Sequence, residues 1–323
     1  MEKQHSVYIN PLTDFGFKFL FGSEENKEFL LSFLNALIPQ DGEIIDVKFI
    51  DKENIGKTKD ERAFIYDLHC VTSTGKKLIV EMQNRYQSYF RDRAIYYMAA
   101  DIVAQARKGI EWKYRLTPIY GIFLMNFVWD DKNEQLKEEV CLTNIHTREI
   151  FSDKFKMIFL KIPLLNKRPE ECKDILSQWI YILQNMDSME RMPQSFKQNP
   201  IFRHLGDVAK VAALSPTQKE AYDHSLKVYR DTYAILDTER MQGFNEGMEK
   251  GIQKGMAKGI EKGMAKGIEK GIEKGIEKGM AKGLEKGMEK ATIDIAKRML
   301  KGGIPIESVS IMTGLSSSEL SKL

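Results

Sequence analysis

Two short apolar segments joined by a turn constrain the fold of this chain more than any other feature. Residues 63–71 and 77–83 are rich in β-branched and other apolar residues, and Thr-Ser-Thr-Gly-Lys at 72–76 separates them. This composition is typical of two strands in a β-hairpin. A hairpin centred on the middle of the turn places Asp67 directly opposite Glu81, on one face of the sheet.

The opposed carboxylates need a neutralising partner. Directly opposed residues in an antiparallel pair have Cβ atoms about 4.5–5.5 Å apart, and two carboxylates that close repel unless a proton or cation lies between them. Mg²⁺ is often held by one or two carboxylates together with a substrate phosphate. Gln83 projects to the same face as Glu81 because it follows two residues later. We interpret Asp67, Glu81 and Gln83 as a metal-dependent phosphodiesterase site; the alternative is an ordinary solvated polar face of a hairpin.

The charge balance gives no global signal for nucleic acid. The 323 residues carry a formal net charge of +3, and the glycine-rich segment 243–290 holds eleven lysines and eight glutamates. The rest of the chain is therefore balanced, so any contact with nucleic acid must come from a local patch.

The cysteines and apolar stretches indicate a cytoplasmic protein without a membrane partner. Cys70, Cys141 and Cys172 are scattered and have no zinc-binding spacing, which favours a reducing compartment. No apolar segment follows basic residues at the N-terminus, so we expect no signal peptide. The longest apolar stretch, 119–129, is too short and interrupted to span a membrane.

The order of the predicted elements indicates an α/β fold with a mixed sheet flanked by helices. Besides the hairpin, the sequence predicts a short helix within 11–22, capped by Thr13 or Asp14 and ended by Gly22. It also predicts helices at 24–38 and 89–108, and strands at 43–50, 118–128, 138–144 and 155–162. The nearly continuous apolar run at 118–128 is typical of a strand that is buried on both faces.

Composition divides the chain into four parts. We expect an α/β core at 1–165, a helical extension at 166–242, a repeat segment at 243–290 and a small helical coda at 291–323. The coda has three short helical patterns and a Gly-containing turn, which resembles a helix-turn-helix. A dimerisation or docking element is the alternative, because the last helix has few basic residues.

The repeat segment has glycine at every fourth residue from Gly243 to Gly287, twelve times in all. Each interior glycine costs a helix about 0.8–1.0 kcal/mol relative to alanine, so this segment is expected to be weakly helical by itself. It is interpreted as a flexible charged spacer. The alternative is a helix that becomes ordered against a partner, for example in a homo-oligomer joined through the C-terminal tail.

The motifs resemble those of one nuclease family. They are PLTDFGFKFLFG at 11–22, Asp67, VEMQ at 80–83 and RDRAIYY at 91–97. This combination is similar to the recombination-promoting nucleases, also called PD-(D/E)XK transposases, and the tail is similar as well. The resemblance implies a PD-(D/E)XK, restriction-endonuclease-like fold and a Mg²⁺- or Mn²⁺-dependent endonuclease that acts on DNA in recombination or transposition.

The resemblance also assigns roles to residues. It implies that Asp67, Glu81 and the backbone carbonyl of Met82 hold the metal and that Gln83 orients the attacking water. Asp14 resembles an acidic residue that the superfamily often places on its first helix, and it is equally suited to cap that helix. Gln83 stands where the family pattern has lysine and supplies no positive charge.

Several alternatives stay open at this stage. Lys18 or Arg93 is a candidate for the missing cation. His69, Arg91, Arg93, Tyr96 and Tyr97 are candidates for lining the cleft or contacting DNA, or for ordinary packing and ion pairs. The competing function is a degenerate nuclease fold that serves as a DNA-binding or assembly module, and the sequence does not distinguish DNA from RNA.

Overall fold

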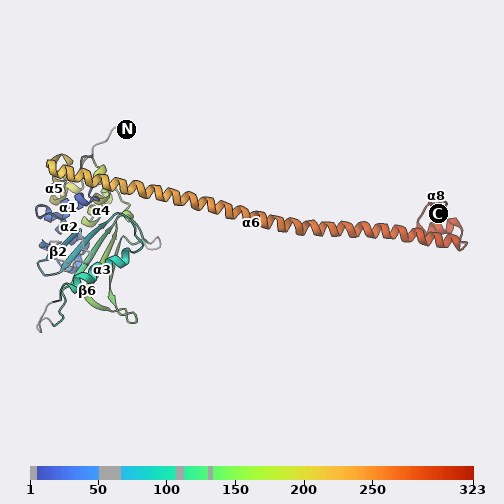
Figure 1. The fold of residues 1–323 in the computed structure, drawn as a ribbon, viewed down its shortest axis with the longest axis horizontal. Helices are drawn as coiled ribbons and strands as arrows, with labels where there is room; N and C mark the ends of the chain where they lie inside the picture. The colour runs from blue at the N-terminus through green and yellow to red at the C-terminus, as the bar shows by residue number, and fades with distance from the viewer. Residues whose placement is uncertain (1–5, 51–66, 107–112, 130–133) are drawn as a thin grey trace, which may run out of the picture. The chain divides into compact units, whose positions relative to one another are not determined.

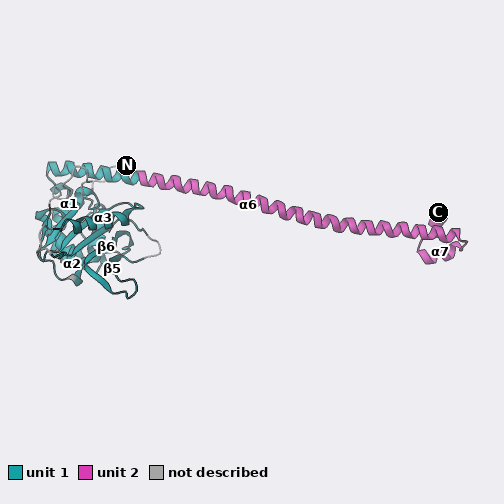
Figure 2. Ribbon diagram, turned by 60° about the horizontal axis from the view of Figure 1, so that its bottom comes forward, with its two compact units in different colours: residues 1–234 teal, residues 235–323 magenta. Residues whose placement is uncertain are grey.

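A computed structural model describes residues 6–50, 67–106, 113–129 and 134–323. The chain divides into two compact units, residues 1–234 and 235–323 (Figure 2). We describe each unit by itself.

The first unit is built around a mixed six-stranded sheet (Figure 1). Its strands are β1 (Val47–Phe49), β2 (Leu68–Thr72), β3 (Lys77–Gln83), β4 (Ile119–Met125), β5 (Lys137–Thr143) and β6 (Ile150–Lys161). They lie in the order β1-β2-β3-β4-β6-β5. The β3–β4 and β4–β6 pairs are parallel and the other pairs are antiparallel.

Helices cover both faces of this sheet. One face, with Leu78, Val80 and Met82 of β3, belongs to a large core that several helices share. They include α1 (Asp14–Phe21), α2 (Lys27–Leu37), α4 (Ile175–Asn185) and α5 (Pro200–Val208), and the start of α6 (Pro216–Lys301) adds Tyr222. The other face, with Ile79 and Phe123, packs against α3 (Phe90–Val103). The predicted mixed sheet flanked by helices is confirmed.

Strand β4 occupies the middle of the sheet, and all of its residues are buried. This confirms the interpretation of the apolar run at 118–128, because a strand covered on both faces has no polar side. Other predicted bounds were less accurate. Strand β1 has three residues, within the predicted 43–50, and α3 ends at Val103 within the predicted 89–108. The predicted strand residues 63–66 lie outside the described residues.

The second unit differs from the expected flexible spacer. Helix α6 runs without interruption from Pro216 to Lys301 and includes the whole repeat. The repeat contains no proline, and three of its four positions hold mostly good helix formers, Lys, Glu, Ala, Met and Leu among them, which offset the cost of glycine.

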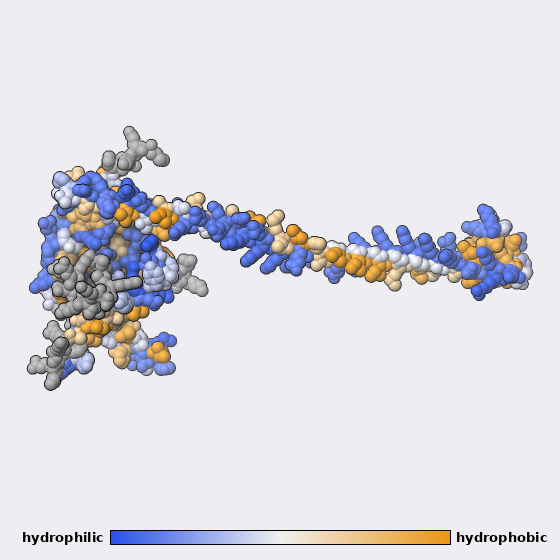
Figure 3. Space-filling view, in the orientation of Figure 1, coloured by the Kyte–Doolittle hydropathy of each residue, from blue (hydrophilic) through white to orange (hydrophobic). Residues whose placement is uncertain are grey.

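The repeat helix exposes its apolar side chains. Ile268 is 59% exposed and Met280 is 72% exposed. A Cβ atom added at any repeat glycine would meet nothing within 4 Å. Polar and apolar surfaces alternate along this helix in Figure 3, because a four-residue period drifts around a helix of about 3.6 residues per turn.

A small core ends the second unit. Helices α7 (Ile306–Thr313) and α8 (Ser317–Leu320) pack onto the end of α6 through Ala296, Val309 and Leu320. Gly314 ends α7 with a φ of 74°, a left-handed conformation that suits glycine. None of the described helices is long and apolar enough to cross a membrane.

Candidate active site

The hairpin register places the two predicted carboxylates side by side. Strand β2 pairs with β3 so that Leu68 lies opposite Val80 and His69 lies opposite Ile79. Asp67 directly precedes β2, and the same register continues to Glu81. The predicted register is therefore confirmed, and side-chain alternation puts Glu81 on the face that α3 covers.

Three hydrogen bonds hold the acidic pair together. The backbone N–H of Asp67 donates to Oε1 of Glu81 at 3.1 Å. The backbone N–H of Met82 donates to Oδ2 of Asp67 at 2.7 Å. Nε2 of Gln83 donates to Oε2 of Glu81 at 3.2 Å. The structure thus brings together Asp67, Glu81 and Gln83, and it ties the backbone of Met82 to the same cluster.

Glu81 has the perturbed ionisation expected of such a pair. Glu81 is only 4% exposed to solvent. Burial, followed by the negative charge of Asp67, raises the pKa of Glu81 to about 8. The carboxyl group therefore holds a proton near neutral pH unless a cation replaces it.

A cation and a phenol from α3 lie within electrostatic reach of this pair. The positive charge of Arg93 acts to lower the pKa of Glu81. Nη1 of Arg93 donates to Oε1 of Gln87 at 2.9 Å, and its guanidinium lies 5.6 Å from the ring centroid of Phe90 and 5.8 Å from that of Tyr97. Burial and the negative charge of Glu81 raise the pKa of Tyr97. Arg93 is thus held in place near the carboxylates.

Lys18, the other candidate cation, has different surroundings. Its Nζ pairs with Oδ1 of Asp14 at 2.5 Å. Both residues belong to α1, whose buried residues pack on the opposite face of the sheet from α3. Of the two cations considered from the sequence, only Arg93 has a described interaction with Glu81.

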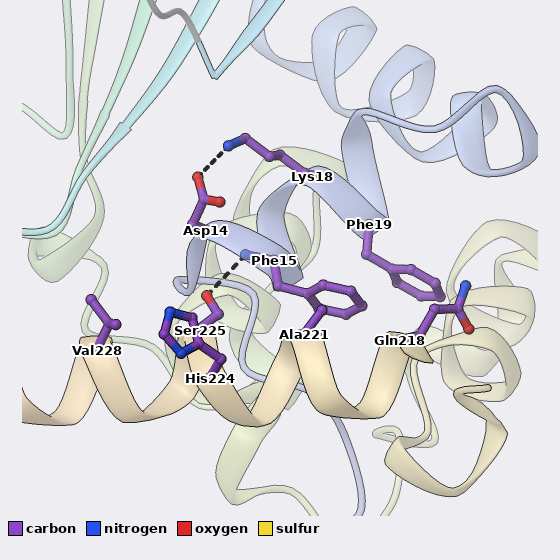
Figure 4. A pocket seen from close by; sticks show the side chains of 9 residues that line it. All are labelled: Asp14, Phe15, Lys18, Phe19, Gln218, Ala221, His224, Ser225 and Val228. Carbon is purple, nitrogen blue, oxygen red and sulfur yellow. Dashed lines mark hydrogen bonds and ion pairs between the residues drawn. The ribbon is translucent and has the colours of Figure 1, made fainter. Parts of the chain in front are cut away.

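Asp14 lies at the first turn of α1, and the preceding residue, Thr13, caps the helix through a 2.9 Å bond from the Gly16 N–H. Asp14 and Lys18 line a pocket of about 580 Å³ between α1 and the start of α6 (Figure 4). The described contacts of Asp14 do not connect it to Asp67 or Glu81. The end of β3 is nevertheless tied to the segment before α1, because Nδ2 of Asn84 donates to the Leu12 carbonyl at 2.7 Å. A catalytic role for Asp14 stays a prediction.

His69 belongs to a buried structural network. Its Nε2 lies 3.1 Å from Oδ2 of Asp101, while Nζ of Lys77 donates to Oδ1 of Asp101 at 2.7 Å. Burial acts to raise the pKa of Asp101, but the hydrogen bonds from His69 and Lys77 outweigh it and the pKa is lowered. This network links α3 to β2 and β3. Sequence reasoning did not find it, because nothing in the pattern relates residue 101 to residues 69 and 77.

The donor set suits a divalent ion that keeps part of its own water shell. Within the described ranges, no cluster of three or more His, Cys, Asp or Glu side chains is placed to hold a metal ion. At this site the protein would therefore contribute two carboxylates and a backbone carbonyl. Two carboxylates with an adjacent backbone carbonyl leave several positions for water or phosphate, as Mg²⁺ prefers. The residues present therefore fit the expected cation.

Comparison with known families identifies the class of protein. The family model described as PD-(D/E)XK nuclease family transposase matches residues 11–239. The C-terminal HTH domain of the Rpn/YhgA-like nuclease family matches residues 289–323. Searches of curated proteins and of solved structures found no match. The chain belongs to the PD-(D/E)XK nuclease family transposases, which confirms the resemblance inferred from its motifs.

Proposed function

We propose that this protein is a metal-dependent endonuclease that hydrolyses phosphodiester bonds in DNA during recombination or transposition. The observation that carries the proposal is the convergence of Asp67 and Glu81 on one face of the sheet, joined by the hydrogen bond from the Asp67 N–H. Membership of the nuclease family and the matched helix-turn-helix support DNA as the substrate.

Asp67, Glu81 and the carbonyl of Met82 would hold Mg²⁺ or Mn²⁺. A divalent ion bound there lowers the pKa of its water and polarises a phosphate oxygen. Side chains of the protein would position the carboxylate and the attacking water and supply positive charge. The side chain of Gln83 donates a hydrogen bond to the Glu81 carboxylate and would orient the attacking water. Arg93 supplies the positive charge that Gln83 lacks. An accessory role for Asp14 remains part of the proposal, without a described contact to the acidic pair.

The competing function is a degenerate nuclease fold that binds DNA or organises an assembly. The amide of Gln83 in the position of the usual lysine favours it. In this alternative, the acidic pair is neutralised by a proton on Glu81 rather than by a metal. DNA binding is then retained when divalent ions are absent and does not require Asp67.

We also propose that the tail mediates self-association. Apolar side chains at every fourth residue, from Phe244 to Met288, are more than half exposed along α6. The adjacent glycines leave room for a second helix to approach closely. Sedimentation of the full chain tests this: we expect an oligomer, and a monomer at all concentrations contradicts it.

Plasmid cleavage tests the proposed enzyme. We expect the purified full chain to nick or linearise plasmid DNA in the presence of Mg²⁺. Cleavage should stop when EDTA removes the metal ion. Asp67→Asn and Glu81→Gln should each abolish cleavage. Asp153→Asn is the matched control, because its side chain is 78% exposed on β6 and pairs only with the neighbouring Lys154 among the described ion pairs. Unchanged cleavage by Asp67→Asn would remove the site assignment.

A further inference from the structure

An exposed aromatic and basic surface lies directly beside the candidate site. Residues 84–97 contain four tyrosines, three arginines and one acidic residue. Three of the tyrosines are more than half exposed: Tyr86 at 55%, Tyr89 at 57% and Tyr96 at 59%. Aromatic side chains with this exposure are common at binding surfaces, because their rings provide contact area with little loss of conformational freedom.

Other side chains make the buried contacts of α3. The helix contacts the sheet through Phe90, Ala94 and Met98, which are buried in the second core. Tyr89 precedes the first residue of the helix, and Tyr96 follows seven residues later. Seven residues are close to two helical turns, so the two positions share one face about 10 Å apart along the axis. That separation suits two different bases rather than one.

The surface continues into the acidic pair. The segment that carries Tyr86 and Tyr89 directly follows β3, whose last residue is Gln83. On the same helix, Arg93 acts electrostatically on Glu81. The segment that carries the tyrosines and the acidic pair therefore belong to the same side of the sheet, the side that α3 covers.

The charge of this surface suits a phosphate backbone. Arg85 and Arg91 are exposed, and the guanidinium of Arg91 lies 4.7 Å from the ring centroid of Trp129. Asp92, which directly follows Arg91, is exposed and offsets one of the three arginine charges. The remaining positive charge attracts a nucleic acid, while exposed rings favour bases whose faces are free. In a duplex those faces are covered by neighbouring bases.

We propose that Tyr89 and Tyr96 form a stacking surface for unpaired bases of a DNA strand beside the carboxylate site, with Arg85 contacting its phosphates. The substrate class is then DNA with a single-stranded portion, such as a flap, bubble or free strand, rather than an uninterrupted duplex. The choice of DNA rests on the proposed function; the preference for unpaired bases rests on the exposed rings.

Fluorescence anisotropy of the full chain in EDTA tests the proposal without cleavage. The probes are a labelled single strand of about 16 nucleotides, the upper range for such sites, and the duplex of the same sequence. We expect the Tyr89→Ala/Tyr96→Ala double variant to raise the Kd for the single strand by about tenfold or more, since each stacked base contributes strongly. The Kd for the duplex should change little, because we expect the matched helix-turn-helix to bind the duplex independently of these tyrosines.

Two control variants sharpen the result. The Tyr89→Phe/Tyr96→Phe variant keeps the rings and should retain single-strand binding. Tyr114→Ala removes a tyrosine that is 83% exposed and precedes β4 in the sequence. The first residue of β4 pairs with Lys77, which is at the opposite end of β3 from Gln83. This variant should bind like the unaltered protein. Circular dichroism will verify that each variant is folded.

The outcomes separate this inference from the proposed enzyme. No loss of single-strand binding in the double alanine variant, or an equal loss for single strand and duplex, would overturn the stacking surface. Loss in the phenylalanine variant as well would overturn stacking in favour of hydroxyl contacts. Absence of Mg²⁺-dependent cleavage with the expected binding pattern would instead refute the nuclease proposal and leave the surface intact.

Discussion

The two units of this molecule use their apolar residues in opposite ways. In the first, residues such as Phe33 and Trp179 are at most 1% exposed and contact one another across helices. In the repeat helix of the second, Ile260 and Ile272 are 62% and 58% exposed. The first unit is thus stabilised by its own core, and it fixes individual polar side chains in defined positions. The repeat presents many equivalent positions and gains little from intramolecular packing, which is the observation behind the proposed self-association of the tail.

Substitutions in the core of the first unit should have the largest effect on the free energy of unfolding. Phe33 is 1% exposed and lies 5.7 Å from the ring centroid of Phe21. We expect Phe33→Ala to lower the free energy of unfolding by about 3–5 kcal/mol, because it removes a large side chain and leaves a cavity. Urea denaturation followed by fluorescence measures this. Ile268→Ala in the repeat is the matched control and should change the stability of the first unit negligibly; a similar loss would show that the repeat supports that core.

The second prediction concerns the ionisation of the acidic pair. The pKa of Glu81 in the folded protein is about 8, well above its ordinary value of 4.5. Between these values the folded protein holds a proton that the unfolded chain has released, so stability in EDTA should fall as pH rises from about 5 to 8. We expect the free energy of unfolding to fall by about 3 kcal/mol over this pH range because of Glu81.

Thermal or urea unfolding across this pH range tests that prediction. The relevant quantity is the difference between the unaltered protein and Glu81→Gln, whose amide does not titrate. The variant should lose most of the decline in stability with rising pH. Identical pH profiles for the two proteins would show that Glu81 is not protonated near neutral pH.

The smallest predicted effect concerns the helicity of the repeat segment in the tail. Gly267→Ala and Gly271→Ala place Cβ atoms where nothing lies within 4 Å along α6. Each change should favour the helix by about 1 kcal/mol and raise its helicity, as measured by circular dichroism. Cleavage by the first unit should stay unchanged. If self-association requires close approach at the glycines, sedimentation will show weaker association in the same variants; reduced helicity would contradict an exposed glycine stripe.

The sequence predicted the parts of the site that depend on local pattern. A short turn determines a hairpin register, so the pairing of Asp67 with Glu81 could be predicted from spacing. The buried strand β4 could be predicted because continuous apolar residues suit a covered strand. The role of Arg93 could only be guessed, since its position depends on how α3 docks on the sheet, which no local pattern specifies.

Other features depend on tertiary contacts that the sequence does not reveal. The network of His69, Lys77 and Asp101 joins residues from three elements. The pairing of Asp14 with Lys18 and the packing of α1 on the opposite face separate this acid from the described carboxylate contacts. The continuous repeat helix was underestimated because glycine propensity was weighed without the helix-forming residues between the glycines.

Calorimetric titration of Mn²⁺ into the full chain at pH 8 tests the central claim most directly. At this pH much of the Glu81 population has lost its proton, and binding should release the remainder. We expect a binding site that both Asp67→Asn and Glu81→Gln remove and that Asp153→Asn retains. Equal Mn²⁺ binding by all four proteins, or none by the unaltered chain, would contradict a divalent-ion site at the acidic pair.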